Sequence, residues 1–418
     1  MKIKKYHLID AIIYFGFCTI FLYDFIMCFL SNKSILVLLS FLAIATLSFC
    51  GFFNDKQFVS IDTMIYVFVF LFAYYAPLHQ YITNANIHSY EPFTDFEYLY
   101  GNIIVLLFLV TYMFTKRYLK HKVKKLWIIE IDFLITDAGA ILLTILSAIC
   151  LLWLYSKHEV FPFVSNIADV DGTNDTLIGI ITRIIRFFPA AALFLFTSAM
   201  KKGKFVAGKF VKYFTLILVF LIFAIVFNPI GGTMNRYILF GTFVMLLANW
   251  FEECQHKSYV LLVAIVGFYF VFPAFNFFKY NSFSNISSFE WGGFDVNSND
   301  YDSYQVMLQT IRYVREHGIV WGKNILSAVL CIIPRSIWKS KSLPSGQLIT
   351  EAINAEFTNV SCPLFAEFYL AFGLVGIVIG TILFGNLIKI IEYGNKKDNY
   401  YYRGLYFITI GIIMSYMR

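Results

Sequence analysis

The chain has 418 residues, of which 59% are apolar, 20% are aromatic and only 14% are charged. Soluble domains carry about 25% charged residues, so this composition leaves too little polar surface to cover a globule in water. The formal charge of +7 does not indicate nucleic-acid binding, because the basic residues stand beside hydrophobic blocks, where they set membrane topology. The composition therefore excludes a soluble domain and gives no support for a nucleic-acid partner.

Apolar blocks long enough for a helix to cross about 30 Å of hydrocarbon recur along the whole chain. The fold class that we predict is all-α, a polytopic transmembrane helical bundle of about eleven spans. In chain order the predicted spans are residues 8–30, 34–53, 59–82, 98–115, 135–155, 177–199, 213–228, 236–251, 258–278, 362–388 and 402–417. The first block lacks a small-x-small cleavage site and is too long for a signal-peptide core, so we expect it to be retained.

The connections between these spans predict the topology. Basic residues gather at the N-terminus and in the connections 116–125, 201–212 and 389–403, whereas residues 83–97 contain no Lys or Arg. Because positive residues stay cytoplasmic, the N-terminus is expected inside and Arg418 outside.

The same topology divides the chain into three parts. They are an N-terminal bundle of nine spans at 1–278, a large extracytoplasmic loop at 279–361 and the C-terminal spans at 362–418. Within the loop, residues 303–317 have a helical pattern. Residues 323–338 are apolar but short and interrupted by Pro334 and Arg335, which predicts an interfacial or re-entrant helix. A long loop without a soluble fold is usually functional, so the working face is expected to be extracytoplasmic.

Two places near the outer ends of spans carry arginines that suit an anion. Arg183 and Arg186 lie inside the sixth span at i and i+3, on one helix face. Each costs about 2.5–3.5 kcal/mol in hydrocarbon, which favours a site facing a cavity over simple snorkelling to the surface. Arg236 ends the turn NPIGGTMNR, whose glycine pair leaves N–H groups exposed at a helix start, a suitable place for phosphate.

The segment IPRSIWKSKSLPSG is the most distinctive part of the loop. It puts Arg335, Lys339 and Lys341 beside Trp338. Such cations suit a diphosphate, which Arg binds in a forked geometry, and the indole suits stacking on a sugar. An ordinary interfacial belt of Trp and cations is the alternative reading.

Glu367 stands about one turn into the tenth span. It is a candidate general base, although a carboxylate there also favours a helix N-terminus, and Glu356 or Asp302 are alternatives for the same role. Gly373, Gly376 and Gly380 are interpreted as packing glycines. The seven scattered cysteines form no CxxC pair, and no P-loop or dinucleotide fingerprint occurs, so we predict no metal site and no cofactor.

Taken together, three motifs in the second half of the chain resemble a known family. NPIGGTMNR before a span, PRSIWKSKSLPSG in the outer loop and AEFYLAFGLVG at the next span resemble the O-antigen and capsular repeat-unit polymerases of bacteria, the Wzy-type family. The resemblance covers residues 228–395, and the first half matches only in hydropathy. Where the family pattern has a Lys followed directly by a Pro, this sequence has Lys341 and Pro344 with two residues between them. The sequence stops at Arg418 directly after a span, where members usually continue, so we expect truncation there.

This resemblance implies a lipid-using, metal-independent membrane glycosyltransferase. Such enzymes polymerise undecaprenyl-diphosphate-linked repeat units into O-antigen or capsular polysaccharide at the outer face of the bacterial cytoplasmic membrane. The implied partners are the lipid-linked glycans, membrane lipid and a chain-length regulator protein. The residues that we assign are Arg335, Glu367 and Arg236 for catalysis, Arg183, Arg186, Lys339 and Lys341 for the diphosphate, and Trp338 for the sugar.

Two other functions remain open at the level of the sequence. An O-antigen ligase would use the same donor on the same side of the membrane, and only the acceptor would differ. A transporter or flippase of lipid-linked glycan is a different class. The sequence disfavours it, because the two halves show no internal repeat of the kind that many transporters have.

Overall fold

The computed structural model describes most of the chain. The described residues are 5–55, 57, 59–88, 90–118, 137–158, 188–196, 208–227, 233–252, 295–330, 333, 335–355, 360–396 and 400–418, with isolated residues at 267, 277, 287 and 288. Helices dominate these segments, and no strand occurs within them. The predicted all-α class is therefore confirmed for the described part of the chain.

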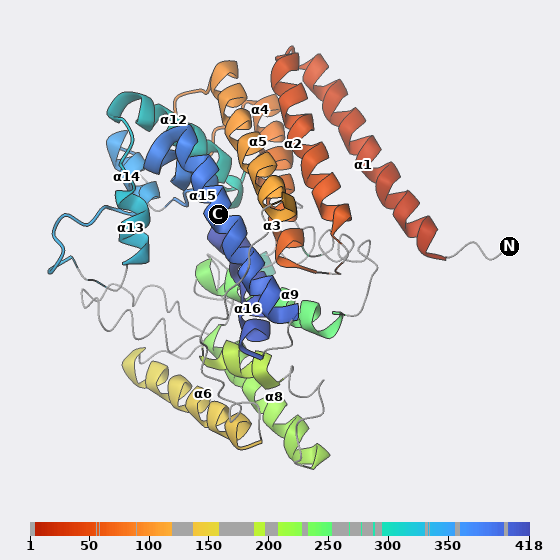
Figure 1. Ribbon diagram of the computed structural model, residues 1–418, viewed down its shortest axis with the longest axis vertical. Coiled ribbons are helices and arrows are strands. Elements are labelled where there is room, and N and C mark those ends of the chain that lie inside the picture. Colours follow the sequence, from red (N-terminus) through yellow and green to blue (C-terminus); the bar gives the residue numbers. More distant parts are fainter. Residues whose placement is uncertain are drawn as a thin grey trace.

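The helices follow the chain in the order shown in Figure 1. They are α1 (Lys5–Leu30), α2 (Ile35–Asn54), α3 (Ile61–Phe70), the π-helix η1 (Leu71–Tyr75), α4 (Ala76–Thr83), α5 (Asp95–Tyr118), α6 (Asp137–His158), α8 (Lys209–Val226), α9 (Thr233–Trp250), the 3₁₀-helix η6 (Asn299–Tyr301), α12 (Ser303–His317), α13 (Lys323–Val329), α14 (Ser345–Ala352), α15 (Leu364–Lys396) and α16 (Tyr400–Met417).

Among the described residues, five helical stretches are long and apolar enough to cross a membrane. They are Ile35–Asn54, Ile61–Thr83, Asp95–Tyr118, Lys209–Val226 and Leu364–Lys396, with shorter apolar helices at Cys18–Leu30, Ile141–Cys150 and Tyr237–Trp250. The predicted ninth span lies almost wholly outside the described residues, and only 188–196 of the sixth is described. The count of eleven spans stays a prediction.

The core lies where α2, α3, α5, α15 and α16 pack together, with α9 against α16. Helices α6 and α8 pair with each other and share a second, smaller core with residues 190–196. The contact of α9 with α16 depends on glycine, because a Cβ atom at Gly241 would lie 2.0 Å from the carbonyl oxygen of Gly411. Small residues that allow such close backbone approach are typical of helices packed in membranes.

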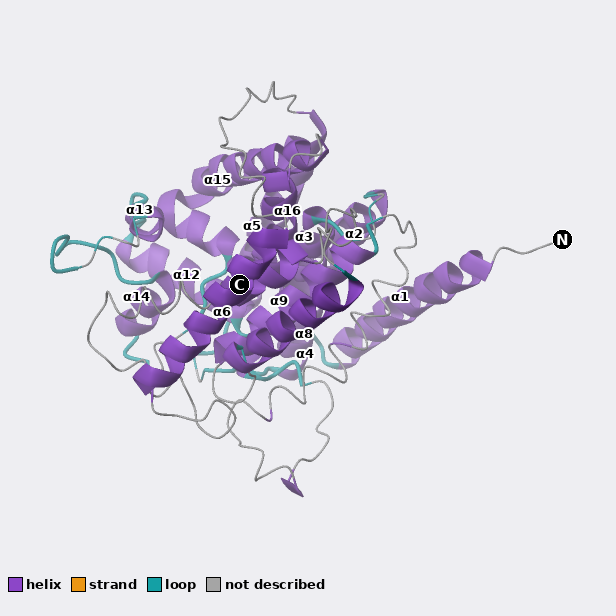
Figure 2. Cartoon of the chain, turned by 90° about the horizontal axis from the view of Figure 1, so that it is seen from below, coloured by secondary structure: helices purple, strands orange, loops and turns teal. Residues whose placement is uncertain are grey.

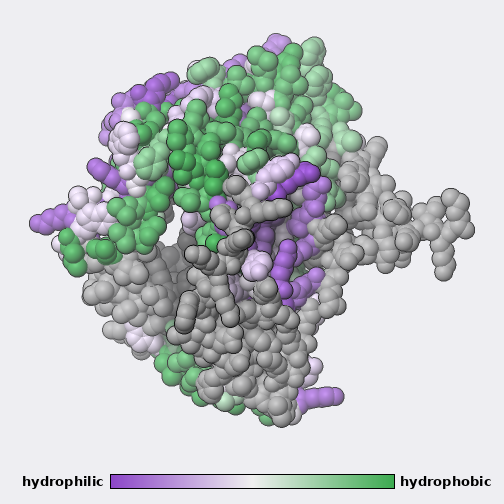
Figure 3. Space-filling model, in the orientation of Figure 1, coloured by the Kyte–Doolittle hydropathy of each residue, from purple (hydrophilic) through white to green (hydrophobic). Residues whose placement is uncertain are grey.

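The outer surface of the bundle is apolar. Leu36, Phe114 and Leu383 each expose more than half of their side chains. Figure 3 shows hydrophobic residues over much of the upper part of this face, with hydrophilic residues toward α12 and again near the middle of the view. Monomeric soluble proteins rarely expose apolar patches of this extent. This surface is compatible with a membrane protein.

The two ends of the bundle collect different segments. At one end of the bundle, which we call the "loop end", three segments meet: residues 84–94, residues 295–302 and Arg418. There the His88 ring lies 2.9 Å from the Asp302 carboxylate, and Gln80 donates hydrogen bonds to the carbonyls of Val296 and Tyr301. All three segments were predicted to lie on one side of the membrane.

We call the opposite end of the bundle the "basic end". There, Lys and Arg side chains from connections that were predicted to be cytoplasmic form ion pairs with acidic side chains. Lys116 bridges Asp62 and Glu392 at 3.0 and 2.5 Å, and Arg403 binds Glu252 at 2.6 Å. Segments that the alternating topology puts on one side therefore meet at one end of the bundle.

Three predicted elements differ from the structure. The third span is helical throughout but contains the π turn η1. The tenth is broken, because Phe372 and Gly373 leave helical geometry and Gly373 adopts a φ of 62°. The predicted helix at 323–338 is helical only over Lys323–Val329, and a turn follows at 335–337.

The break at Gly373 also corrects the role predicted for that residue. Among the described residues, a Cβ atom at Gly373 would have no heavy atom within 4 Å. One at Gly376 would lie 2.2 Å from the carbonyl oxygen of Phe368, and one at Gly380 would lie 2.6 Å from the Phe368 ring. Gly376 and Gly380 are therefore at close contacts. Gly373 is required instead by the break itself, because its positive φ would strain a residue that has a side chain.

Candidate functional site: a held carboxylate and a cationic turn

The Glu367 carboxylate is held by two side chains from the long polar segment. Ser345 donates a hydrogen bond to its Oε2 atom at 2.6 Å, and the Asn324 amide donates to the same oxygen at 2.7 Å. Asn324 also donates to the Glu367 backbone carbonyl at 3.0 Å. One half-buried carboxylate thus connects α13, α14 and α15. Helix α15 begins directly after Pro363, and the partial positive charge of its N-terminus favours an acidic side chain in this first turn.

The break in α15 explains how Asn324 reaches Glu367. Because the helix stops at Phe372, the carbonyls of Leu370 and Ala371 are free to accept hydrogen bonds from the backbone N–H groups of Val320 and Gly322. These bonds fasten the chain just before α13, so that Asn324 lies in the first turn of that helix. The Oδ1 atom of Asn324 is buried and has no hydrogen-bond partner within the described residues, which leaves an acceptor beside the carboxylate.

The turn at 335–341 presents the cations that the sequence singled out. Arg335 is exposed and donates one hydrogen bond, at 3.0 Å, to the carbonyl of Ser342. The Ser342 N–H in turn donates to the Ser327 hydroxyl of α13. Lys339 is exposed. The turn containing Arg335 is therefore fastened three residues before Ser345, the residue that holds the Glu367 carboxylate.

The side chains of Lys341 and Trp338 donate hydrogen bonds within this turn. The Lys341 ammonium donates to the carbonyls of Ile333 and Leu330 at 2.9 and 3.3 Å, so it supports the turn as well as adding charge. The half-buried Trp338 donates its indole N–H to the Ser340 hydroxyl at 3.0 Å. Ile337, between the cations, is 77% exposed, which gives the turn an apolar side chain in addition to its charges.

Other predicted site residues are not brought to this place by the described structure. Arg183, Arg186 and Glu356 lie outside the described residues. Arg236 falls in α9, but its side chain also lies outside the described part. Within the described chain the site therefore consists of Glu367 with its partners and the turn at 335–341.

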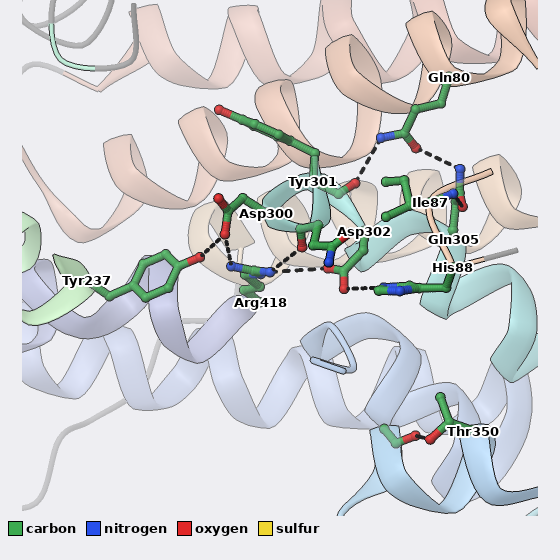
Figure 4. Close-up of polar contacts among 12 residues, drawn as sticks. Gln80, Ile87, His88, Tyr237, Asp300, Tyr301, Asp302, Gln305, Thr350 and Arg418 are labelled. Atoms are coloured by element: carbon green, nitrogen blue, oxygen red, sulfur yellow. Dashed lines mark hydrogen bonds and ion pairs between the residues drawn. The ribbon is translucent and has the colours of Figure 1, made fainter. Parts of the chain in front are cut away.

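Asp302 belongs to a second polar cluster at the loop end (Figure 4). Arg418 lies 3.3 Å from Asp302 and 3.7 Å from Asp300, and the Tyr237 hydroxyl donates to Asp300 at 3.2 Å. Burial raises the pKa of Asp302, and the hydrogen bond with His88 opposes that rise. This "aspartate cluster" joins α9, α16 and the start of α12. We therefore assign Asp302 a structural role in holding these helices together, and not the role of a general base.

A third polar contact fixes the other end of α12. The Arg312 guanidinium donates to both oxygens of Glu97 at 2.6 and 2.9 Å and to the carbonyls of Glu91 and Pro92. It also lies 4.5 Å from the centre of the Phe93 ring. Neither Arg312 nor Glu97 was predicted from the sequence as a site residue. Arg312 could have been suspected as a charge on the apolar side of a helical pattern, but its partner is 215 residues away.

Across the described residues, no group of three or more His, Cys, Asp or Glu side chains is placed to hold a metal ion. Chemically, the Glu367 cluster offers one oriented carboxylate, a buried amide acceptor and, on the same segment, exposed cations. A carboxylate of this kind can accept a proton from a hydroxyl. The guanidinium and ammonium groups can stabilise a developing phosphate charge. Comparison with protein families, with curated proteins and with solved structures finds no match.

Proposed function

We propose that this chain is a membrane glycosyltransferase that polymerises lipid-diphosphate-linked oligosaccharide repeat units. The observation that carries the proposal is the Glu367 carboxylate held by Ser345 and Asn324, on the same segment as the exposed Arg335 and Lys339. A polymerase needs both groups: a base for the acceptor hydroxyl and cations for the diphosphate that leaves. The motif resemblance to Wzy-type polymerases supports the same reading.

The proposed step is a displacement at the anomeric carbon of the donor sugar. The acceptor hydroxyl oxygen forms a bond to that carbon, its proton passes to the Glu367 carboxylate, and the bond from the carbon to the diphosphate oxygen breaks. The diphosphate leaves on its lipid with the electron pair of that bond. Arg335 and Lys339, with Arg236, Arg183 and Arg186, stabilise its charge, while Lys341 supports the turn and Trp338 contacts the sugar.

This function implies a location and partners. The substrates are undecaprenyl-diphosphate-linked glycans in a bacterial cytoplasmic membrane, the loop end is the extracytoplasmic face, and a chain-length regulator is a further partner. The product is O-antigen or capsular polysaccharide.

The assignment of residues can be tested by complementing a deletion strain with variants. Glu367→Gln should lower the rate of polymer formation by about 10²–10⁴-fold, and Arg335→Ala by about 10²–10³-fold, comparable to loss of a charge-stabilising donor. The matched controls are Glu316→Gln and Arg315→Ala, whose side chains are 57% and 63% exposed. Surface polysaccharide is resolved on a gel, with membrane insertion checked by immunoblot. Normal polymer from the inserted Arg335→Ala protein would refute its role.

A further inference from the structure

An open pocket lies between α1 and the segment formed by η1 and α4. Its volume is 430 Å³, within the roughly 300–1,000 Å³ typical of ligand pockets. It is lined by Thr19, Ile20, Tyr23, Asp24, Tyr75 and His79. Figures 1 and 2 both show α1 on the flank of the molecule opposite to α13 and α14, so this pocket is separate from the Glu367 site.

The pocket contains a buried carboxylate that is only partly satisfied. Asp24 is 1% exposed, and its Oδ2 atom accepts a hydrogen bond from the Tyr74 hydroxyl at 2.6 Å. Its Oδ1 atom has no hydrogen-bond partner within the described residues. The Nε2 atom of His79 lies 3.9 Å from Oδ1, beyond hydrogen-bonding distance. A buried acceptor without a donor is costly, so this oxygen is a place where a ligand donor would gain affinity.

The backbone beside the pocket has an unusual geometry with a clear cause. Pro77 has no N–H group to donate within the helix, and the Ala76 N–H bonds to the carbonyl of Leu71, five residues earlier, in a π turn. This turn contains Tyr74, which holds Asp24, and Tyr75, which lines the pocket. Single π turns inside α-helices are rare and frequently mark functional sites.

The chemistry of the lining selects a ligand class. The Asp24 Oδ1 atom has almost no accessible area, whereas the His79 side chain is 25% exposed, so a ligand hydroxyl reaches Oδ1 only when the His79 ring turns. A hydroxyl oxygen about 2.8 Å from both Nε2 and Oδ1 would then accept from the imidazole and donate to the carboxylate. The ring of Tyr23 is stacked at 26° to that of His79 and supplies a flat apolar surface for the C–H face of a sugar. None of the described residues that line the pocket is Lys or Arg, so its known lining offers a phosphate no cationic partner.

The position of the pocket indicates where the ligand comes from. Asp24 lies six residues before the end of α1, about 9 Å along a helix, and that end faces the loop end, where Lys33 bonds to Asn84. Tyr23 in the pocket wall is 51% exposed on a helix that we assign to the membrane. A sugar bound here would therefore sit within the outer part of the bilayer.

We propose that the pocket between α1 and α4 binds a sugar residue of a membrane-borne glycolipid, with one sugar hydroxyl bridging His79 and Asp24. The identification of that glycolipid as the lipid-linked glycan substrate rests on the proposed function, whereas the sugar site itself does not.

The test measures binding to the full-length protein in nanodiscs by native mass spectrometry. The probes are undecaprenyl diphosphate carrying one N-acetylhexosamine, undecaprenyl diphosphate without sugar, and the free methyl glycoside. We expect the wild type to prefer the glycolipid over the bare lipid by about tenfold or more. Asp24→Asn should abolish this preference, and Glu316→Gln should keep it.

A second variant keeps the test decisive if the Asp24→Asn protein does not fold. Thr19 is exposed at the edge of the pocket, so Thr19→Phe fills the cavity without removing a buried contact and should also abolish the preference. Equal affinity of the wild type for both lipids, or an unchanged preference in Thr19→Phe, would overturn the proposal. Competition by the methyl glycoside at the same concentration as the glycolipid would overturn the membrane-borne source. A preference that depends on Asp24 in a protein whose deletion leaves polymer intact would uphold the site and refute the polymerase.

Discussion

Replacing Arg312 by methionine should destabilise the protein more than any exposed charge substitution on the same helix. The guanidinium makes two hydrogen bonds to Glu97 and two to backbone carbonyls, and the Arg312 and Glu97 side chains are only 12% and 6% exposed. Methionine keeps much of the apolar stem but leaves the carboxylate buried without its main partner. Breaking a buried pair in this way costs about 3–5 kcal/mol.

Arg315 provides a matched control, because it approaches the same Glu97 oxygen at 3.9 Å but is 63% exposed. Arg315→Met should cost less than about 1 kcal/mol. Unfolding in mixed detergent–SDS micelles gives both values, and a double-mutant cycle with Glu97→Gln measures the coupling. The double variant Glu97→Gln/Arg312→Met should lose less than the two single variants added together. Equal stability losses for Arg312→Met and Arg315→Met would refute the reasoning.

Two further predictions concern the residues around the start of α15. Gly373→Ala should destabilise the protein by about 1–3 kcal/mol in the same unfolding assay, because φ is 62° there. Gly16 lies within α1 and no described atom is within 4 Å of a Cβ placed there; alanine is favoured over glycine in a helix by up to about 1 kcal/mol, so Gly16→Ala should not destabilise the protein. Equal destabilisation by the two variants would contradict the strain argument. Burial raises the pKa of the Cys362 thiol well above its ordinary range, so the thiol stays protonated at pH 8 and should react slowly with N-ethylmaleimide. The control is a Cys362→Ser protein that carries Ser361→Cys, because position 361 is exposed. The cysteine at position 361 should react faster than Cys362. Equal rates by mass spectrometry would show that Cys362 is not held in this environment.

The sequence predicted the described helices well because hydrophobic length is a local property. Residues 34–53 were predicted as a span, and α2 covers Ile35–Asn54. The amphipathic pattern at 303–317 likewise predicted α12 to the residue. Glu367 could be singled out because a carboxylate near an apolar span is unusual.

The rest depends on contacts between distant segments, which local patterns do not encode. Two side chains hold Glu367. Asn324 comes from α13, whose start is bonded to the carbonyls freed by the break at Phe372 and Gly373, and Ser345 comes from α14, 22 residues before Glu367. That break was misread, because Gly373 looked like one more packing glycine in a row. The π turn before Pro77 had a visible signal, a proline inside an apolar block, but its effect on the tyrosines around Asp24 could not be deduced from spacing.

The central claim, that the protein joins lipid-linked repeat units into polymer, is tested most directly by deleting its gene. Surface polysaccharide from the deletion strain and from a strain complemented with the wild-type gene is compared on a gel. The polymerase proposal predicts that each glycan collapses to a single repeat unit on its final carrier, and that the complemented strain regains full-length polymer. Full-length polymer that accumulates on undecaprenyl diphosphate would contradict the proposal and identify a ligase, and loss of all external glycan with single units trapped inside would identify a transporter.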